Sequence, residues 1–256
     1  MKPIDLNCDM GELPEAIADG TQELLMQYVT SANIACGGHA GDVETMRATI
    51  EQALRRHVAV GAHPGYEDRA NFGRIELQLA PEQIAASVER QIRALDDVAR
   101  KCGARIAHVK PHGALYNQAA RDRVIASAIA DGVRRWRTDV ILVGLAGSVM
   151  LEEFRAAGFA VAAEAFADRR YEPDGSLRSR KCSDALLTDP QQAAEQAFRI
   201  VEQSSAVACD GATVPLHAQT LCLHGDTPGS LSIAEAIHRR LTNPHIKLAS
   251  LQGDWP

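Results

Sequence analysis

Several kinds of residue and motif are scarce or missing in this chain of 256 residues, and each absence argues against a class of protein. Aromatic residues make up 4% of the chain, the net charge is −6 and there is no basic block, so nucleic acid is not expected as a partner. No apolar run approaches the ~20 residues that span a bilayer, and the first residues turn polar too early for a secretory signal. We therefore expect a cytoplasmic protein.

Common catalytic and cofactor motifs are also absent. The chain has no G-x-x-x-x-G-K-[ST] phosphate loop, no G-x-G-x-x-G dinucleotide fingerprint, no G-x-S-x-G nucleophile elbow and no H-E-x-x-H pair. The six cysteines form no C-x-x-C pair, which indicates reduced thiols and not a disulfide framework. Any active site must therefore be gathered from separate parts of the chain.

Short apolar runs alternate with amphipathic segments along the whole chain. The runs predict buried parallel strands at residues 4–8, 32–36, 59–62, 106–109, 140–145, 160–166 and 220–223. The segments between them predict helices at residues 43–57, 81–103, 118–135, 148–157, 190–203 and 230–241. This order predicts right-handed βαβ units, and seven strands fit a (β/α)7 barrel better than an open sheet. No linker is visible, so we expect a single domain over residues 1–256.

Polar residues follow the first two predicted strands. Asn7, Asp9 and Glu12 close the first strand, where they suit a metal site or a general base, although a turn with a helix cap would use the same residue types. His39 follows the second strand between glycines, which is hard to explain by packing. Asp42, by contrast, is explained equally well as the N-cap of the next helix.

The third and fourth predicted strands also end in reactive residues. His63 lies where the third strand must break, before a Pro-Gly pair. Lys110, His112 and Asn117 follow the fourth strand in one run. Lys110 is a candidate for anchoring a carboxylate or phosphate, and His112 for acid–base work or metal binding.

The last two strands add charged residues. Glu164 and Arg169 belong to the sixth strand and its end, Arg180 lies in the irregular stretch 168–189, and His224 and Asp226 follow the seventh strand. Arginines beside a site suit an anionic substrate, although a solvated loop is also rich in arginine. We expect the stretch 168–189 to form a loop, a candidate lid, over the strand ends.

The segments DLNCDMGE, SANIACGGHAGD, VGAHPGY, HVKPHGALYN, EAFADRRY and CLHGD together resemble the LamB/YcsF family, in the same order and spacing. The resemblance implies a barrel of the glycoside hydrolase/deacetylase type. It also implies ATP-dependent ring opening of 5-oxo-L-proline to L-glutamate, carried out with two other subunits, B and C. The complex would consume ATP with Mg²⁺. Gly38, Ile75 and Ser183-Asp184 depart from the family pattern, which indicates mild remodelling of the site.

On this resemblance we assign catalytic roles to Asp9, His63, Lys110 and His112. Asp9, His63 and His112 would also hold a divalent metal, with His39 as a rival third ligand, and the alternative is that they only bind substrate. Asn33 would hydrogen-bond the lactam, and Lys110 with Arg169 or Arg180 would hold the carboxylate or phosphate. The expected substrate-binding residues are Asn7, Asn33, His39, Asn117, Glu164, Arg169, Arg180, His224 and Asp226.

Two other classes of function stay open at this point. One is a stand-alone metal-dependent amidohydrolase or deacetylase acting on a small amide or sugar, which would need neither ATP nor partners. The other is a non-catalytic subunit that binds a lactam and delivers it. The density of titratable groups at the strand ends argues against a purely passive role.

Overall fold

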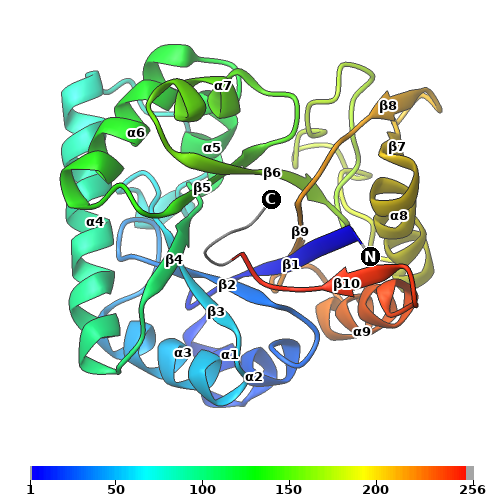
Figure 1. The fold of residues 1–256 in the computed structure, drawn as a ribbon, viewed down its shortest axis with the longest axis horizontal. Helices are drawn as coiled ribbons and strands as arrows, with labels where there is room; N and C mark the ends of the chain where they lie inside the picture. The colour runs from blue at the N-terminus through cyan, green and yellow to red at the C-terminus, as the bar shows by residue number, and fades with distance from the viewer. Residues whose placement is uncertain (1, 252–256) are drawn as a thin grey trace.

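Seven parallel strands form a closed ring in the computed structural model, which describes residues 2–251. The ring order is β1-β2-β3-β4-β5-β6-β9, and it closes because β9 pairs with β6 on one side and with β1 on the other (Figure 1). The strands are β1 (Lys2–Met10), β2 (Ser31–Ala35), β3 (Ala59–His63), β4 (Ile106–Val109), β5 (Ile141–Leu145), β6 (Ala160–Phe166) and β9 (Thr220–His224). The predicted (β/α)7 barrel is confirmed.

Three short strands lie outside the ring. β7 (Ser205–Val207) and β8 (Thr213–Pro215) form an antiparallel hairpin, and β10 (Ile246–Leu248) pairs with the first residues of β1. Each has only three residues, too few to give a recognisable pattern, and the sequence did not predict them. Residues 1 and 252–256, which the predicted domain includes, lie outside the described residues.

Helices surround the ring (Figure 1). They are α1 (Pro14–Ala18), α2 (Thr21–Leu25), α3 (Val43–Arg55), α4 (Pro81–Lys101), α5 (Gly113–Ala119), α6 (Arg123–Trp136), α7 (Val149–Ala156), α8 (Pro190–Gln203) and α9 (Ser230–Leu241). The single helix predicted at 118–135 is wrong, because Asp122 caps a new helix by accepting from the amides of Val124 and Ile125. Among the residues that the structure describes, no helix has both the length and the apolar character needed to cross a membrane.

The barrel interior contains a polar cluster at the N-terminal part of β1. Asp5 is fully buried, and its carboxylate accepts hydrogen bonds from the hydroxyls of Thr30 and Ser31, both 2.6 Å, and of Thr220 at 2.5 Å. Burial raises the pKa of Asp5 to about 6, although the three hydroxyls lower it. The ionised form of Asp5 is therefore costly in the folded state near neutral pH.

We predict that Asp5 makes the protein less stable as the pH rises. A carboxyl with a raised folded pKa binds its proton more tightly in the folded state, so this stabilisation is complete below the unfolded pKa of about 3.9 and is lost as the pH passes about 6. The free energy of unfolding of Asp5→Asn, relative to the wild type, should improve by about 1 kcal/mol between about pH 5 and pH 7.5. Urea unfolding at both pH values measures this.

The matched control is the exposed carboxylate Glu51, whose Glu51→Gln variant should follow the wild type at both pH values. A difference between Asp5→Asn and wild type that does not change with pH would contradict the raised pKa.

Candidate active site

A cavity of about 800 Å³ opens at the carboxyl ends of the barrel strands, where the loops after the strands meet. Ten of the candidate residues identified in the sequence line it: Asp9, Glu12, His63, Lys110, His112, Asn117, Arg169, Arg180, His224 and Asp226. Four other predicted residues, Asn7, Asn33, His39 and Glu164, are buried and do not line the cavity. The candidate residues therefore form one site, in which some line the cavity and the others are buried.

Two histidines of this site face each other with fixed tautomers. The backbone carbonyl of Lys110 lies 2.8 Å from Nδ1 of His63, and that of Phe72 lies 3.0 Å from Nε2 of His112. Because a carbonyl only accepts, both of these ring nitrogens carry hydrogen. In neutral rings the remaining nitrogens, Nε2 of His63 and Nδ1 of His112, then carry lone pairs. They are 2.9 Å apart, so a shared proton or another cation must lie between them.

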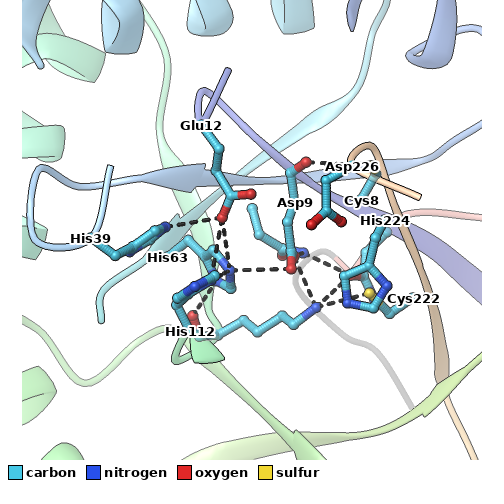
Figure 2. A network of polar contacts seen from close by, with 12 residues as sticks. Cys8, Asp9, Glu12, His39, His63, His112, Cys222, His224 and Asp226 are labelled. Carbon is cyan, nitrogen blue, oxygen red and sulfur yellow. Dashed lines mark hydrogen bonds and ion pairs between the residues drawn. The ribbon is translucent and has the colours of Figure 1, made fainter. Parts of the chain in front are cut away.

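Glu12 completes this group. Its Oε1 lies 2.9 Å from Nε2 of His39, 3.2 Å from Nδ1 of His112 and 3.8 Å from Nε2 of His63 (Figure 2). The ring of His39 stacks on that of His112, with centroids 3.6 Å apart. One carboxylate oxygen thus sits among three imidazoles, with all four ligand atoms within 4.8 Å of one another. We call Glu12, His39, His63 and His112 the histidine cluster.

The positive charge of the histidine cluster is concentrated on one ring. Burial, with the charge of His112, lowers the pKa of His39 to about 3, and burial also lowers the pKa of His112. Burial lowers the pKa of His63 too, but the carboxylate of Asp9, 3.3 Å away, outweighs it and raises that pKa overall. Without another cation, the shared proton therefore belongs mainly to His63.

Asp9 does not belong to the histidine cluster, although the sequence predicted it as a metal ligand with His63 and His112. It groups instead with Cys222 and His224, and the ammonium of Lys110 occupies this second group, 2.9 Å from Asp9 and 3.1 Å from Cys222 Sγ. The geometry therefore favours Glu12 over Asp9 in any cation site.

Lys110 is buried, and its ammonium faces protein acceptors. Nζ lies 2.9 Å from both Asp9 and Glu164, and it also donates to the amide oxygen of Asn7 at 3.2 Å. Burial lowers the pKa of Lys110, but the two carboxylates raise it well above its usual value. Burial in turn raises the pKa of Asp9, and His63 and Lys110 together bring it well below its usual range. The hydrogens of Lys110 thus face protein acceptors, two of which are carboxylates that its charge balances, so the predicted role of anchoring a substrate anion is not favoured.

The buried asparagines also contact protein groups. Asn7 donates to Glu164 at 2.9 Å and to Thr220 at 2.6 Å, and its oxygen accepts from Asn33 and Lys110. Asn33 donates to Asn7 and Asp9. These two amides hold Asp9, Glu164 and Lys110 in place by hydrogen bonds. The predicted contact of Asn33 with a lactam is therefore not favoured.

Charged residues from different loops form the rim of the cavity. Oδ2 of Asp226 accepts from Arg74 at 2.5 Å and from Arg180 at 3.2 Å. Arg169 is more deeply buried, and burial with the charge of Arg180 lowers its pKa to about 10. Asn117, on α5, is exposed and lines the cavity. The rim therefore carries these three arginines, two of which hold the carboxylate of Asp226.

Arg74 and His108 belong to the site and were not predicted. Arg74 lies far from any strand end in the sequence. Asp168, one of the charged residues that directly follow β6 in the sequence, holds His224 through its ring, at 2.9 Å, and its backbone amide. His108 lies inside β4, where a rule based on strand ends does not find it.

Comparison with known proteins finds relatives over almost the whole chain. The LamB/YcsF family matches residues 4–254. A protein of Chloroflexus aggregans that is named as the A subunit of 5-oxoprolinase is 50% identical over 241 residues, which cover 94% of this chain and 96% of that protein. A protein of Methylococcus capsulatus with the same name is 48% identical, covering 99% of this chain and 97% of that protein.

Solved structures share the fold of this chain. A lactam utilization protein from Thermus thermophilus superposes with a TM-score of 0.89 at 41% identity, covering 97% of this chain and 99% of the other. A family 4 carbohydrate esterase from Streptomyces lividans shares only the fold, with a TM-score of 0.52 at 11% identity, over 96% of this chain and 91% of the esterase. On the extent and identity of these matches, the chain belongs to the LamB/YcsF family.

Proposed function

We propose that this chain is the A component of an ATP-dependent 5-oxoprolinase, which opens 5-oxo-L-proline to L-glutamate together with subunits B and C. The observation that carries the proposal is the match, over almost the whole chain, to relatives named as 5-oxoprolinase A subunits at 48–50% identity. The cavity supports it, because histidines, carboxylates and arginines converge at its floor and rim. A cytoplasmic location stays a prediction.

The rim and the floor of the cavity have separate tasks in this proposal. Arg74 and Arg180 would bind the carboxylate of the substrate, because their guanidinium groups reach into the cavity and already hold a carboxylate, that of Asp226. The lactam ring would then lie toward Asp9, His63 and His112 on the floor. A cavity of about 800 Å³ has room for a small ring and its activating group.

The histidine pair would move the protons of ring opening. Water must lose a proton as it attacks the lactam carbon, and the ring nitrogen must gain one as it leaves. The proton shared by His63 and His112 can pass to the leaving ring nitrogen, and the lone pair that this frees can take the proton that the water loses. ATP, consumed by the complex with Mg²⁺, would activate the lactam oxygen, and the absence of a phosphate loop here favours ATP binding by a partner subunit.

We further propose that a divalent metal ion can replace the shared proton of the histidine cluster. The donor set fits such an ion, since lone pairs of His63 and His112 and an oxygen of Glu12 lie close together, and Nε2 of His39 is 2.9 Å from the same oxygen. When bound, the metal would act as a Lewis acid on an oxygen of the substrate. The fixed tautomers of His63 and His112 keep the two lone pairs facing each other in either case.

The first prediction from the proposed function concerns the reaction. Glutamate release from 5-oxo-L-proline with ATP should be absent with this chain alone and should appear when its cognate B and C subunits are added. His112→Ala should lower the rate in that mixture at least about a hundredfold, since it removes half of the proton-sharing pair. The exposed His245→Ala is the matched control and should keep wild-type activity. Activity by this chain alone without ATP would instead favour a stand-alone amidohydrolase.

The second prediction concerns the metal. Purified protein given Zn²⁺ and then dialysed should retain close to one ion per chain, and Glu12→Gln should retain far less, because it loses the charged ligand. Elemental analysis measures retention, and thermal unfolding with and without the metal measures its effect on stability. Equal retention by wild type and Glu12→Gln, with no shift in unfolding temperature, would contradict the site.

The third prediction concerns Lys110. Lys110→Met leaves the carboxylates of Asp9 and Glu164 buried without their counter-ion, which should lower the free energy of unfolding by about 3–5 kcal/mol. The matched control is Lys101→Met on the exposed end of α4, which should change it by less than about 0.5 kcal/mol. Urea unfolding compares the two, and equal small losses would show that Lys110 does not balance these charges.

A further inference from the structure

Four residues at one level of the barrel connect β4 to β1. In the strand register Asp9 of β1 lies opposite Asn33 of β2, Asn33 lies opposite Gly61 of β3, and Gly61 lies opposite His108 of β4. The side chains of Asn33 and His108 are buried inside the ring, that of Asp9 also lines the cavity, and Gly61 has none. The layer therefore has a gap at β3, which lies between the imidazole of His108 and the amide of Asn33.

His108 fills the gap at Gly61. Its imidazole extends across β3, and its Nε2 comes to 2.7 Å from Oδ1 of Asn33 on the far side. A Cβ atom at Gly61 would lie 2.0 Å from that same Nε2, so no other residue type at this position is compatible with the contact. The contact between His108 of β4 and Asn33 of β2, which passes over β3, thus explains why residue 61 is glycine.

The direction of each hydrogen bond in this layer is fixed. The amide nitrogen of Asn33 is 2.8 Å from Oδ1 of Asp9 and 2.7 Å from Oδ1 of Asn7, and it must donate to both. Its oxygen then faces His108 and can only accept, so Nε2 of His108 carries the hydrogen. Burial and the nearby charge of Lys110 lower the pKa of His108 to about 3, so the ring is neutral and Nδ1 has the lone pair.

The same layer orients the carboxylate of Asp9. Oδ1 is held by Asn33 at 2.8 Å and by Lys110 at 2.9 Å, which leaves Oδ2 directed at Nε2 of His63, 3.3 Å away. If the amide of Asn33 turned over, its oxygen would face the oxygen of Asp9 and repel it. Within residues 2–251, the hydrogen bond from His108 is the one that holds the oxygen side of this amide in its present orientation.

We propose that His108 is a positioning residue, which acts through Asn33 to present Oδ2 of Asp9 to His63, and that Gly61 provides the passage for its ring. The kinetic part of this proposal rests on the proposed function, since it requires the Asp9–His63 contact to serve ring opening. The structural part, a neutral His108 with hydrogen on Nε2, does not.

The kinetic test replaces His108 with glutamine and with asparagine, whose side chains both end in an amide. Glutamine can place an N–H close to where Nε2 donates, whereas asparagine is too short to reach Asn33 across β3. In the complete complex with B and C, His108→Gln should keep kcat within about threefold of wild type, and His108→Asn should lose at least about tenfold. KM for 5-oxo-L-proline should change by less than about twofold in both, because the rim that binds the carboxylate is untouched.

Equal kcat values for the two variants, or a loss that falls on KM instead, would overturn the positioning role. Gly61→Ala gives an independent check, since its Cβ displaces the ring of His108 and should reproduce the kcat loss of His108→Asn. Wild-type kcat in Gly61→Ala would also overturn it.

The structural test needs no activity. In protein labelled with ¹⁵N in histidine, the ring signals of His108, assigned by comparison with His108→Gln, should show hydrogen on Nε2 and none on Nδ1 at neutral pH. Hydrogen on Nδ1, or a charged ring, would overturn the inference directly. If the wild-type mixture makes no glutamate, the proposed function fails, and these ring signals still decide whether His108 donates to Asn33.

Discussion

The ammonium of Lys110, buried between the carboxylates of Asp9 and Glu164, is the interaction on which the other polar contacts of the barrel depend. A buried charge without a partner costs several kcal/mol, so these three groups can only be buried together. Lys110 follows β4, Asp9 belongs to β1 and Glu164 to β6. Their contact therefore requires the ring to be closed, and it couples the fold to the electrostatics of the cavity floor.

Much of the fold and part of the site could be predicted from the sequence, because strands buried on both faces are continuous apolar runs that end where polar residues begin. The bounds of β4, β6 and α9 were predicted to the residue. His63 and His112 were also predicted to be at one site. They meet because His63 ends β3 and His112 follows β4, which are adjacent parallel strands whose carboxyl ends share one edge.

The remaining features depend on tertiary contacts that no local pattern records. His108 lies within a strand, and the register of β3 and β4 shifts between Val60 and Gly61, which brings His108 opposite Gly61. Whether Glu12 or Asp9 approaches the histidines depends on where the chain turns after β1. The contacts of Lys110 and Asn33 likewise depend on which residues of other strands lie beside them once the ring is closed. Residue type and spacing therefore predicted the members of the site better than their partners.

Asp226 at the cavity rim has a consequence for how any anion enters. Arg74 and Arg180 come from two different loops, and both are already bound to this internal carboxylate. Entry of a ligand is then an exchange of one anion for another and not an addition to vacant arginines. Stray anions that bind guanidinium only weakly gain little from such an exchange. In the proposed reaction each turnover would also re-form the internal pairs, and Asp226 would then be the counter-anion that assists the departure of the product.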